Sequence, residues 1–160
     1  MTRQTVQRYF PYAPEALFDL VGDVLVYPDF LPWIKAMRVT REQRDGDRLT
    51  RLAEAVVGFR MIQQRFSTWV ISDSSARTIE TRLHDGPFRR LHNQWRFDPD
   101  GAGGARVTFE IEYEFSHPIL RALASSVGEE AGRRIMAAFA DEADRRYGAV
   151  TSSVAEAQDR

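Results

Sequence analysis

The chain has 160 residues, of which 43% are hydrophobic and 28% charged, as expected for one globular domain and not for a disordered chain. Its net charge of -1 gives no strong positive field, so DNA binding is not expected. The absence of cysteine excludes disulfides, thiolate metal sites and cysteine nucleophiles. There is no signal-like segment and no run of ~20 apolar residues. We therefore expect a cytoplasmic protein whose only membrane contact would be peripheral, at the inner membrane.

The predicted elements begin with a strand over residues 2–10. A short amphipathic helix follows, because Pro14 suits the first helical position and Glu15 would face the positive end of the helix dipole. Pro28 is expected to end this helix, since the residue before a proline disfavours helical geometry. From residue 36 to 115 the pattern changes to β segments separated by turn signals. These segments predict a meander of about six antiparallel strands.

The clearest strand covers residues 106–115, where apolar and polar residues alternate. Its apolar positions are Val107, Phe109, Ile111, Tyr113 and Phe115. The strand before it alternates in the same way, with one face formed by Leu91, Asn93, Trp95 and Phe97. This alternation indicates a sheet with one buried face and one face in water.

A long helix is predicted over residues 118–147, because apolar residues recur there at helical spacing. The apolar stripe consists of Leu120, Leu123, Ala124, Val127, Ala131, Ile135, Ala138 and Phe139. At about 1.5 Å per residue the helix would be roughly 45 Å long, enough to cross a whole sheet. We expect one domain over residues 1–147, a two-layer α+β fold in which this helix covers the sheet. Residues 148–160 are expected to form a flexible tail.

The stretch DVLVYPDFLPWIK, residues 23–35, carries much apolar surface for a connection between regular elements. Pro28 and Pro32 are expected to prevent a regular element there. Its large apolar residues are Tyr27, Phe30, Leu31 and Trp33. They would lie beside one end of the space between sheet and helix. The segment would then form the lip of a ligand pocket, plug the end of the core, or present an apolar patch to a bilayer.

No catalytic or metal-binding set emerges from the sequence. His84 and His92 lie on strands that could be neighbours, but no third ligand is evident, and exposed side chains are the simpler interpretation. The three glutamates within residues 106–115 alternate onto the face in water. Ser125 has neither a nucleophile elbow nor an obvious base. The sequence therefore predicts a binding protein with no catalytic residues and no metal.

Ligand binding is better supported. The inner face of the last two strands would carry Asn93 among large apolar side chains, and a buried amide needs a hydrogen-bond partner from the protein or from a ligand. Gly128 and Gly132 flank the helical stripe, where they would permit either close packing against the sheet or room for a guest. The predicted ligand-binding residues are Tyr27, Phe30, Leu31, Trp33, Leu91, Asn93, Trp95, Phe109, Tyr113, Leu123, Val127 and Ile135.

Four passages occur in the order and spacing of one known family: LFDLVGDVLVYPDFLPW, DGPFRRLHNQWRF, VTFEIEYEFSHPILRAL and MAAFADEADRRYG. They resemble the coenzyme Q-binding proteins of the START-like, polyketide cyclase/dehydrase superfamily, which also includes bacterial ribosome-association toxins. The match runs from about Thr5 to Gly148, and the block that ends at Trp33 is its most specific part. One departure is Ile34, where many relatives have cysteine.

The resemblance implies a helix-grip fold, a curved antiparallel sheet of about six or seven strands around a long C-terminal helix. It also implies that ubiquinone (coenzyme Q), or a similar prenyl lipid, is bound without turnover by a chaperone or carrier that supports respiration. Covering the lipid tail would be favourable, because exposed apolar surface costs ~25 cal/mol per Å². Asn93, Tyr113 or the Trp95 indole would hydrogen-bond the quinone carbonyls.

Two alternatives stay open. One is a ribosome-associated, toxin-like protein that binds the large subunit and blocks subunit association, although the near-neutral net charge weighs against it. The other is a polyketide cyclase-like enzyme, which would need an acid or base in the pocket.

Overall fold

The computed structural model describes residues 1–59, 61–125 and 130–158, and it contains one seven-stranded antiparallel sheet. The strands are β1 (Thr2–Phe10), β2 (Ile34–Asp45), β3 (Arg48–Phe59), β4 (Ile62–Asp73), β5 (Thr78–Asp85), β6 (Phe88–Pro99) and β7 (Ala105–Phe115). Their order across the sheet is β1-β7-β6-β5-β4-β3-β2. The predicted first strand and the six-stranded meander are therefore confirmed, and β1 joins the sheet beside β7.

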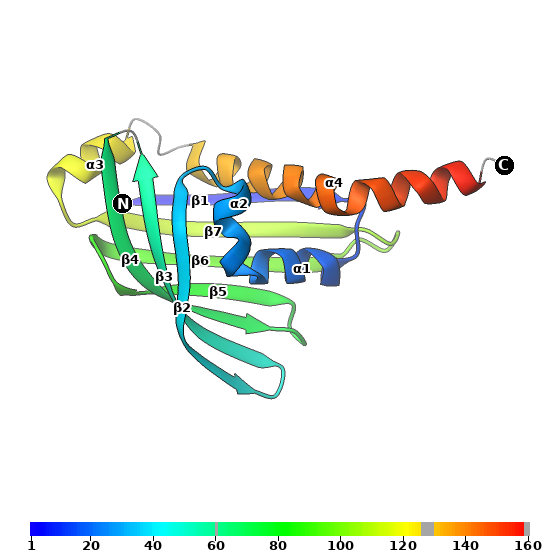
Figure 1. Cartoon of the computed structure of the whole chain (residues 1–160), viewed down its shortest axis with the longest axis horizontal. Coiled ribbons are helices and arrows are strands. Elements are labelled where there is room, and N and C mark those ends of the chain that lie inside the picture. Colours follow the sequence, from blue (N-terminus) through cyan, green and yellow to red (C-terminus); the bar gives the residue numbers. More distant parts are fainter. Residues whose placement is uncertain (60, 126–129, 159–160) are drawn as a thin grey trace.

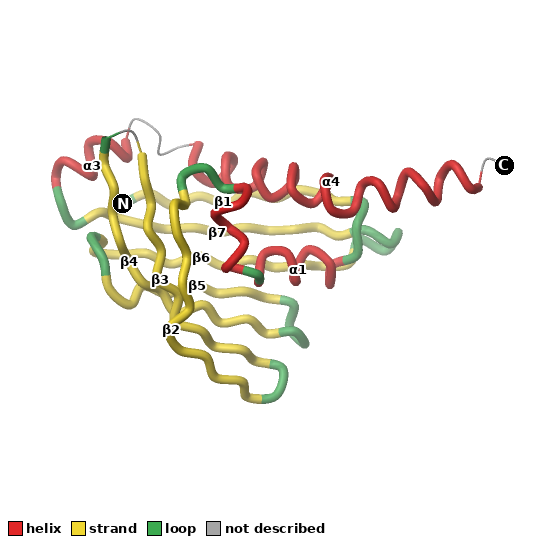
Figure 2. The backbone as a smooth tube through the Cα atoms, in the orientation of Figure 1, coloured by secondary structure: helices red, strands yellow, loops and turns green. Residues whose placement is uncertain are grey.

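Helices cover one face of this sheet, which we call the inner face (Figure 1; Figure 2). They are α1 (Pro14–Gly22), the 3-10 turn η1 (Val24–Val26), α2 (Tyr27–Phe30), α3 (Pro118–Ser125) and α4 (Ala131–Gln158). Helix α4 packs along β1 and β7, whereas α1 packs on β5 and β6. A curved antiparallel sheet with a C-terminal helix lying on it is the predicted α+β helix-grip fold.

The segment around Pro28 is more regular than expected. After α1 ends at Gly22, the chain forms η1 and then the one-turn helix α2. The prediction that Pro28 ends a helix and prevents a regular element is wrong, because Pro28 lies in the first turn of α2. A missing N–H is harmless at that position, since the first N–H groups of a helix have no partner within it. The turn is closed by the Leu31 N–H, which donates to the Tyr27 carbonyl at 2.8 Å.

The prediction of a single long helix over residues 118–147 is also wrong, because the structure has two helices there. Helix α3 contacts β7, which it follows directly, and α4 begins at Ala131. Gly128 stands between them in the sequence but lies outside the described residues; glycine lowers helix propensity by ~1 kcal/mol relative to alanine. Helix α4 continues beyond residue 147 to Gln158. The flexibility of residues 148–160 stays a prediction.

The hydrophobic core lies between the inner face and the helices α1 and α4. Strand β7 alternates as its sequence predicts, with Phe109 and Tyr113 buried and Glu110 exposed. Phe18 of α1 meets Phe97 of β6 edge-on, with 5.8 Å between the ring centroids. The strand alternation therefore decides which face the helices cover, because only the apolar face gains by losing contact with water.

Candidate ligand-binding site

Cross-strand pairing aligns a row of side chains across the inner face. Asn93 on β6 pairs with Ile111 on β7 and with Thr81 on β5. Thr81 in turn pairs with Val70 on β4, and Val70 pairs with Arg51 on β3. Directly opposite residues of antiparallel strands project to the same face of a sheet. The row therefore places an amide, a hydroxyl and a guanidinium among apolar side chains on the inner face.

Three buried side-chain atoms have no hydrogen-bond partner within the described part of the chain: Asn93 Oδ1, Ser72 Oγ and Arg51 Nε. All three belong to the inner face, since Ser72 pairs with Ile79, which pairs with the buried Trp95. Such atoms are uncommon, because leaving a buried polar group unpaired costs ~1–3 kcal/mol. Because all three lie on the inner face, we expect their partners to come from outside the described part of the chain, for example from a ligand or from water.

Aromatic side chains fill part of the space between α4 and the sheet. Phe139 of α4 lies 5.1 Å from Trp95, 5.3 Å from Tyr27 and 5.2 Å from Phe30, measured between ring centroids. Trp95 in turn lies 4.3 Å from Phe109. Edge-to-face contacts of this kind add to the free energy of apolar burial. They hold α2 against α4, so protein side chains occupy this part of the predicted pocket.

Burial decreases toward one end of the sheet. We call this the open end; β2 begins there, β3 turns into β4, β6 begins and β7 ends. Far from it, Phe97 is 0% and Phe109 is 1% exposed. Closer to it, Phe88, Leu91 and Phe115 are only half-buried against the core. An apolar ligand that covered these side chains would complete their burial, which makes this half of the inner face the better candidate for binding.

Ten of the twelve predicted ligand-binding residues have described side chains, and all ten are at least half-buried. Buried among them are Leu31, Trp95, Phe109 and Tyr113, while Tyr27, Phe30, Trp33, Leu91, Asn93 and Ile135 are half-buried. Val127 lies outside the described residues, and the side chain of Leu123 is not described.

Of the three polar groups predicted to meet a quinone, Tyr113 lies buried on β7, opposite Thr2 of β1. Burial raises the pKa of Tyr113, so this phenol stays protonated. Only Asn93 of the three presents a buried atom without a partner. The ligand roles of all these residues stay predictions.

Sequence reasoning missed Arg51 and Ser72. Arg51 is 9% exposed and Ser72 is 6% exposed. A signal for Arg51 was present, because it alternates in register with the apolar residues Ala53 and Ala55 of β3. A charged residue in the apolar row of a strand is a candidate functional group, since such residues are almost never buried unless they are paired.

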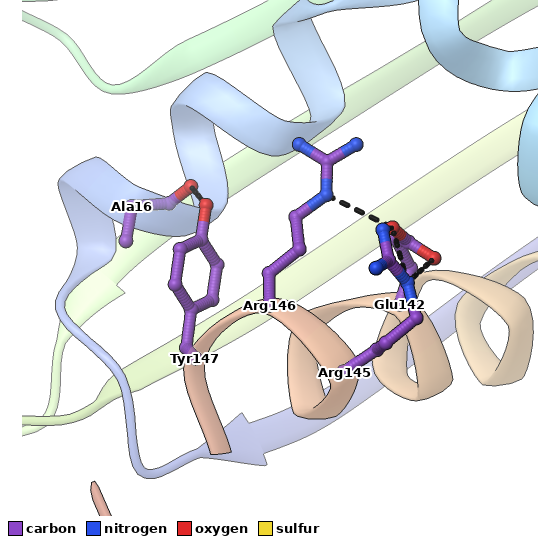
Figure 3. A network of polar contacts seen from close by, with 5 residues as sticks. All are labelled: Ala16, Glu142, Arg145, Arg146 and Tyr147. Atoms are coloured by element: carbon purple, nitrogen blue, oxygen red, sulfur yellow. Dashed lines mark hydrogen bonds and ion pairs between the residues drawn. The ribbon is translucent and has the colours of Figure 1, made fainter. Parts of the chain in front are cut away.

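Figure 3 shows a group of polar contacts on α4, beside one hydrogen bond from α4 to α1. Glu142 is 6% exposed and accepts hydrogen bonds from Arg145 and Arg146, the latter at 2.9 Å between Nε and Oε1. The hydrogen bond from Arg145 lowers the pKa of Glu142, although burial opposes this effect. Beside them, the Tyr147 hydroxyl donates to the Ala16 carbonyl of α1 at 3.1 Å. The contacts of Glu142 therefore lie within α4, whereas the Tyr147 hydrogen bond joins α4 to α1.

His84 and His92, the histidines of β5 and β6, have polar neighbours within the sheet. No group of three metal-ligating side chains occurs among the described residues. His92 instead faces Glu80 at 3.1 Å, and His84 Nδ1 lies 2.9 Å from the Ser67 hydroxyl. Within residues 1–59, 61–125 and 130–158, no helix is long and apolar enough to span a membrane. The inner face offers apolar contact and a few hydrogen bonds, which suit binding.

The fold is that of a START-like domain. A solved START superfamily protein from Mycobacterium smegmatis has the same fold, with a TM-score of 0.74 at 18% identity over 91% of this chain and 99% of that one. The chain belongs to the polyketide cyclase/dehydrase and lipid transport family, whose model matches residues 10–140.

Two relatives identified by sequence similarity carry names that describe different activities. A ribosome association toxin from Pseudomonas aeruginosa is 36% identical over 86% of this chain and 92% of its own length. The mitochondrial coenzyme Q-binding protein of Schizosaccharomyces pombe is 29% identical over 88% of this chain and 85% of its own length. An 18 kDa protein of known structure from Caulobacter crescentus is 42% identical, with a TM-score of 0.76 over 92% of this chain and 99% of that chain. The two named relatives are thus described by ribosome association and by coenzyme Q binding.

Proposed function

We propose that this protein binds ubiquinone, or a similar prenyl lipid, on its inner face and carries it without chemical turnover. The single observation that carries the proposal is Asn93 Oδ1, a buried acceptor that has no partner among the described residues and lies beside half-buried apolar side chains. The relation to a coenzyme Q-binding protein favours a quinone over other lipids. The role would be to support respiratory electron transfer from the cytoplasm, with peripheral contact at the inner membrane.

Asn93 suits either redox form of a quinone. As placed, its Oδ1 accepts a hydrogen bond, which the hydroxyl of a reduced quinone can donate. A half-turn of the amide would instead present its N–H groups to the carbonyl of an oxidised quinone. The prenyl tail would then cover Leu91, Phe88 and Phe115 toward the open end, where the apolar side chains are half-buried.

The open end also carries exposed apolar side chains suited to a lipid surface. Met61, between β3 and β4, is 99% exposed, and Ile119, the second residue of α3, is 61% exposed. Trp33 precedes β2 at the same end and is half-buried. Exposed apolar side chains of this size favour insertion into the interface of a bilayer. A lipid would therefore enter between the sheet and the helices from this end.

Extraction and titration together test the proposal. Protein purified without detergent is expected to yield a prenyl lipid in an organic extract analysed by mass spectrometry. Delipidated protein is expected to bind decylubiquinone saturably, with a rise in melting temperature, because a ligand that binds only the folded state stabilises it. A variant Leu91→Asp should bind weakly, whereas Arg89→Asp, at an exposed position on the same strand, should bind as the wild type does. An empty extract together with no saturable binding would overturn the proposal.

A second candidate function is association with the large ribosomal subunit. The observation that favours it is the 36% identity to a ribosome association toxin, higher than the identity to the coenzyme Q-binding protein. Co-sedimentation of the purified protein with large subunits on a sucrose gradient would support this function, and the loss of intact ribosomes on its addition would establish it. A protein that stays at the top of the gradient and binds decylubiquinone would exclude it.

A further inference from the structure

Arg51 is a buried cation that has no carboxylate partner among the described residues. It is 9% exposed, and no ion pair joins it to an acidic residue in the part of the chain that the structure describes. Glu42, which is its cross-strand neighbour on β2, is exposed to water. An arginine is rarely buried unless its charge is paired, because a desolvated charge needs compensation.

One hydrogen bond of Arg51 is already made. Its Nη2 donates to the carbonyl of Gly22, the last residue of α1. The negative end of the helix dipole favours a cation at this position. This contact explains why the side chain points toward the helices, but it engages one N–H group and provides only a partial negative charge. Nε stays buried without a partner.

Ser72 presents a second unpartnered group at the same place. Its Oγ is buried and makes no hydrogen bond to the described residues. A Cβ on Gly22 would lie 3.9 Å from this oxygen, so Ser72 and the Arg51 guanidinium both lie against the end of α1. Arg51 is on β3 and Asn93 on β6, with β4 and β5 between them. The two groups therefore form a polar site separate from Asn93.

We propose that Arg51 and Ser72 form an anion subsite for the carboxylate of an amphiphilic ligand, such as a fatty acid. The Nε–H of Arg51 and the Ser72 hydroxyl would each donate to a carboxylate oxygen, and the negative charge would neutralise the guanidinium. The inference rests on the proposed function to the extent that the acyl chain must lie on the inner face. The ligand of this subsite differs from a quinone in its headgroup, because a neutral quinone would leave the charge of Arg51 uncompensated.

The test compares dodecanoate with dodecanol, which have the same chain length and differ in the charge of the headgroup. Isothermal titration of the delipidated full-length chain is expected to show dodecanoate binding at least about tenfold more tightly, equivalent to ~1.4 kcal/mol. Arg51→Met should abolish this preference while binding of dodecanol persists, and Ser72→Ala should reduce it several-fold. Arg48→Met, at an exposed position of the same strand, removes the same charge and should keep the preference.

Equal affinities for the two ligands in the wild type would overturn the anion subsite, whatever the variants do. A preference that survives in both Arg51→Met and Ser72→Ala would also overturn it. If Arg51→Met fails to fold, the Ser72→Ala variant and the affinities of the wild type for dodecanoate and dodecanol test the anion subsite. Decylubiquinone is titrated in parallel, because quinone binding without a preference for the acid refutes only this inference. Acid-selective binding without quinone binding refutes the choice of quinone and supports the subsite.

Discussion

The hydroxyl of Tyr12 donates a hydrogen bond of 2.6 Å to the Asp144 carboxylate, although 132 positions separate the two residues. Tyr12 lies between β1 and α1, and its ring also meets the ring of Tyr147 with 5.6 Å between the centroids. Tyr147 in turn donates to the Ala16 carbonyl. The start of α1 is thereby attached to the middle of α4, and this attachment sets the width of the space above the inner face.

Replacing Tyr12 by Phe is expected to lower the free energy of unfolding by about 1–2 kcal/mol, because the hydrogen bond that the Tyr12 hydroxyl donates to the charged Asp144 carboxylate is lost. The variant should also respond differently to alkali. The hydrogen bond to Asp144, together with burial, raises the pKa of Tyr12 from 10.0 to about 12. The unfolded chain therefore loses this proton first, and the contribution of Tyr12 to stability, complete below pH 10, is lost as the pH rises to about 12.

Urea unfolding of wild type and Tyr12→Phe at pH 8 and at pH values above 10 would measure both effects. The difference in unfolding free energy between the two proteins should shrink as the pH rises. A difference that is constant or that grows would show that the Tyr12 hydroxyl is not held in its protonated form by the folded state.

The buried carboxylate of Glu142 gives the opposite dependence on pH. The hydrogen bond from Arg145 holds its pKa below the ordinary value of 4.5, against the effect of burial. The stabilisation is therefore present above pH 4.5 and is lost as the pH falls through the lower pKa of the folded state. Because Arg145 is largely exposed, we expect Glu142→Gln to cost only about 1–2 kcal/mol at neutral pH.

Thermal melts between pH 3 and pH 7 would measure the contribution of the Glu142 carboxylate. Glu142→Gln should lose less stability in acid than the wild type does. Glu130→Gln is the matched control, since Glu130 pairs with Arg134 where both side chains are exposed. We expect that control to change stability by less than ~0.5 kcal/mol. Equal acid sensitivity in the wild type and in Glu142→Gln would contradict the assignment.

Replacing Asn93 by Leu is expected to raise the stability of the protein and to weaken ligand binding. In the ligand-free protein, Asn93→Leu removes a buried acceptor without a partner, so the free energy of unfolding should rise by about 1 kcal/mol. The same change should weaken decylubiquinone binding, because the hydrogen bond to the headgroup is lost. Gln94→Leu, one position along β6 and directed to the other face, is the control for binding. A lower stability with unchanged affinity in Asn93→Leu would show that the amide serves the fold alone.

Gly132 permits the close approach of α4 to β1. Its N–H donates to Gln4 Oε1 at 2.7 Å, and an added Cβ would lie 2.8 Å from that oxygen and 3.1 Å from Val6 Cγ2. Gly132→Ala should therefore destabilise the protein by about 1–3 kcal/mol despite the better helix propensity of alanine. Arg133→Ala, exposed at the next position of α4, should change stability by less than ~0.5 kcal/mol. A Gly132→Ala variant as stable as the wild type would mean that the helix can shift away from β1.

The alternation in β6 and β7 was sufficient to predict the inner face, because a strand turns every second side chain to the same side. The alternation places Asn93 on the same face as Trp95 and Phe109, and the register confirms it. Helical periodicity was less decisive. An apolar stripe continues through a glycine, so it did not reveal that residues 118–147 form two helices.

Close packing at Gly132 also needed the structure. The sequence left two possibilities at the glycines of this region, and the contacts with Gln4 and Val6 decide for close packing at Gly132. Gly128 lies outside the described residues, so the same choice stays a prediction there.

By itself the sequence determined the strands, the meander, the apolar face and the family, because these follow from periodicity, turn residues and local motifs that are close together in the chain. Only the tertiary structure decided that Arg51 and Ser72 meet the end of α1, that Phe139 fills the space between Trp95 and α2, and that burial decreases toward one end of the sheet. The physical reason is that hydrogen-bond satisfaction and packing depend on groups far apart in the sequence, and no local pattern records which of them will be left without a partner.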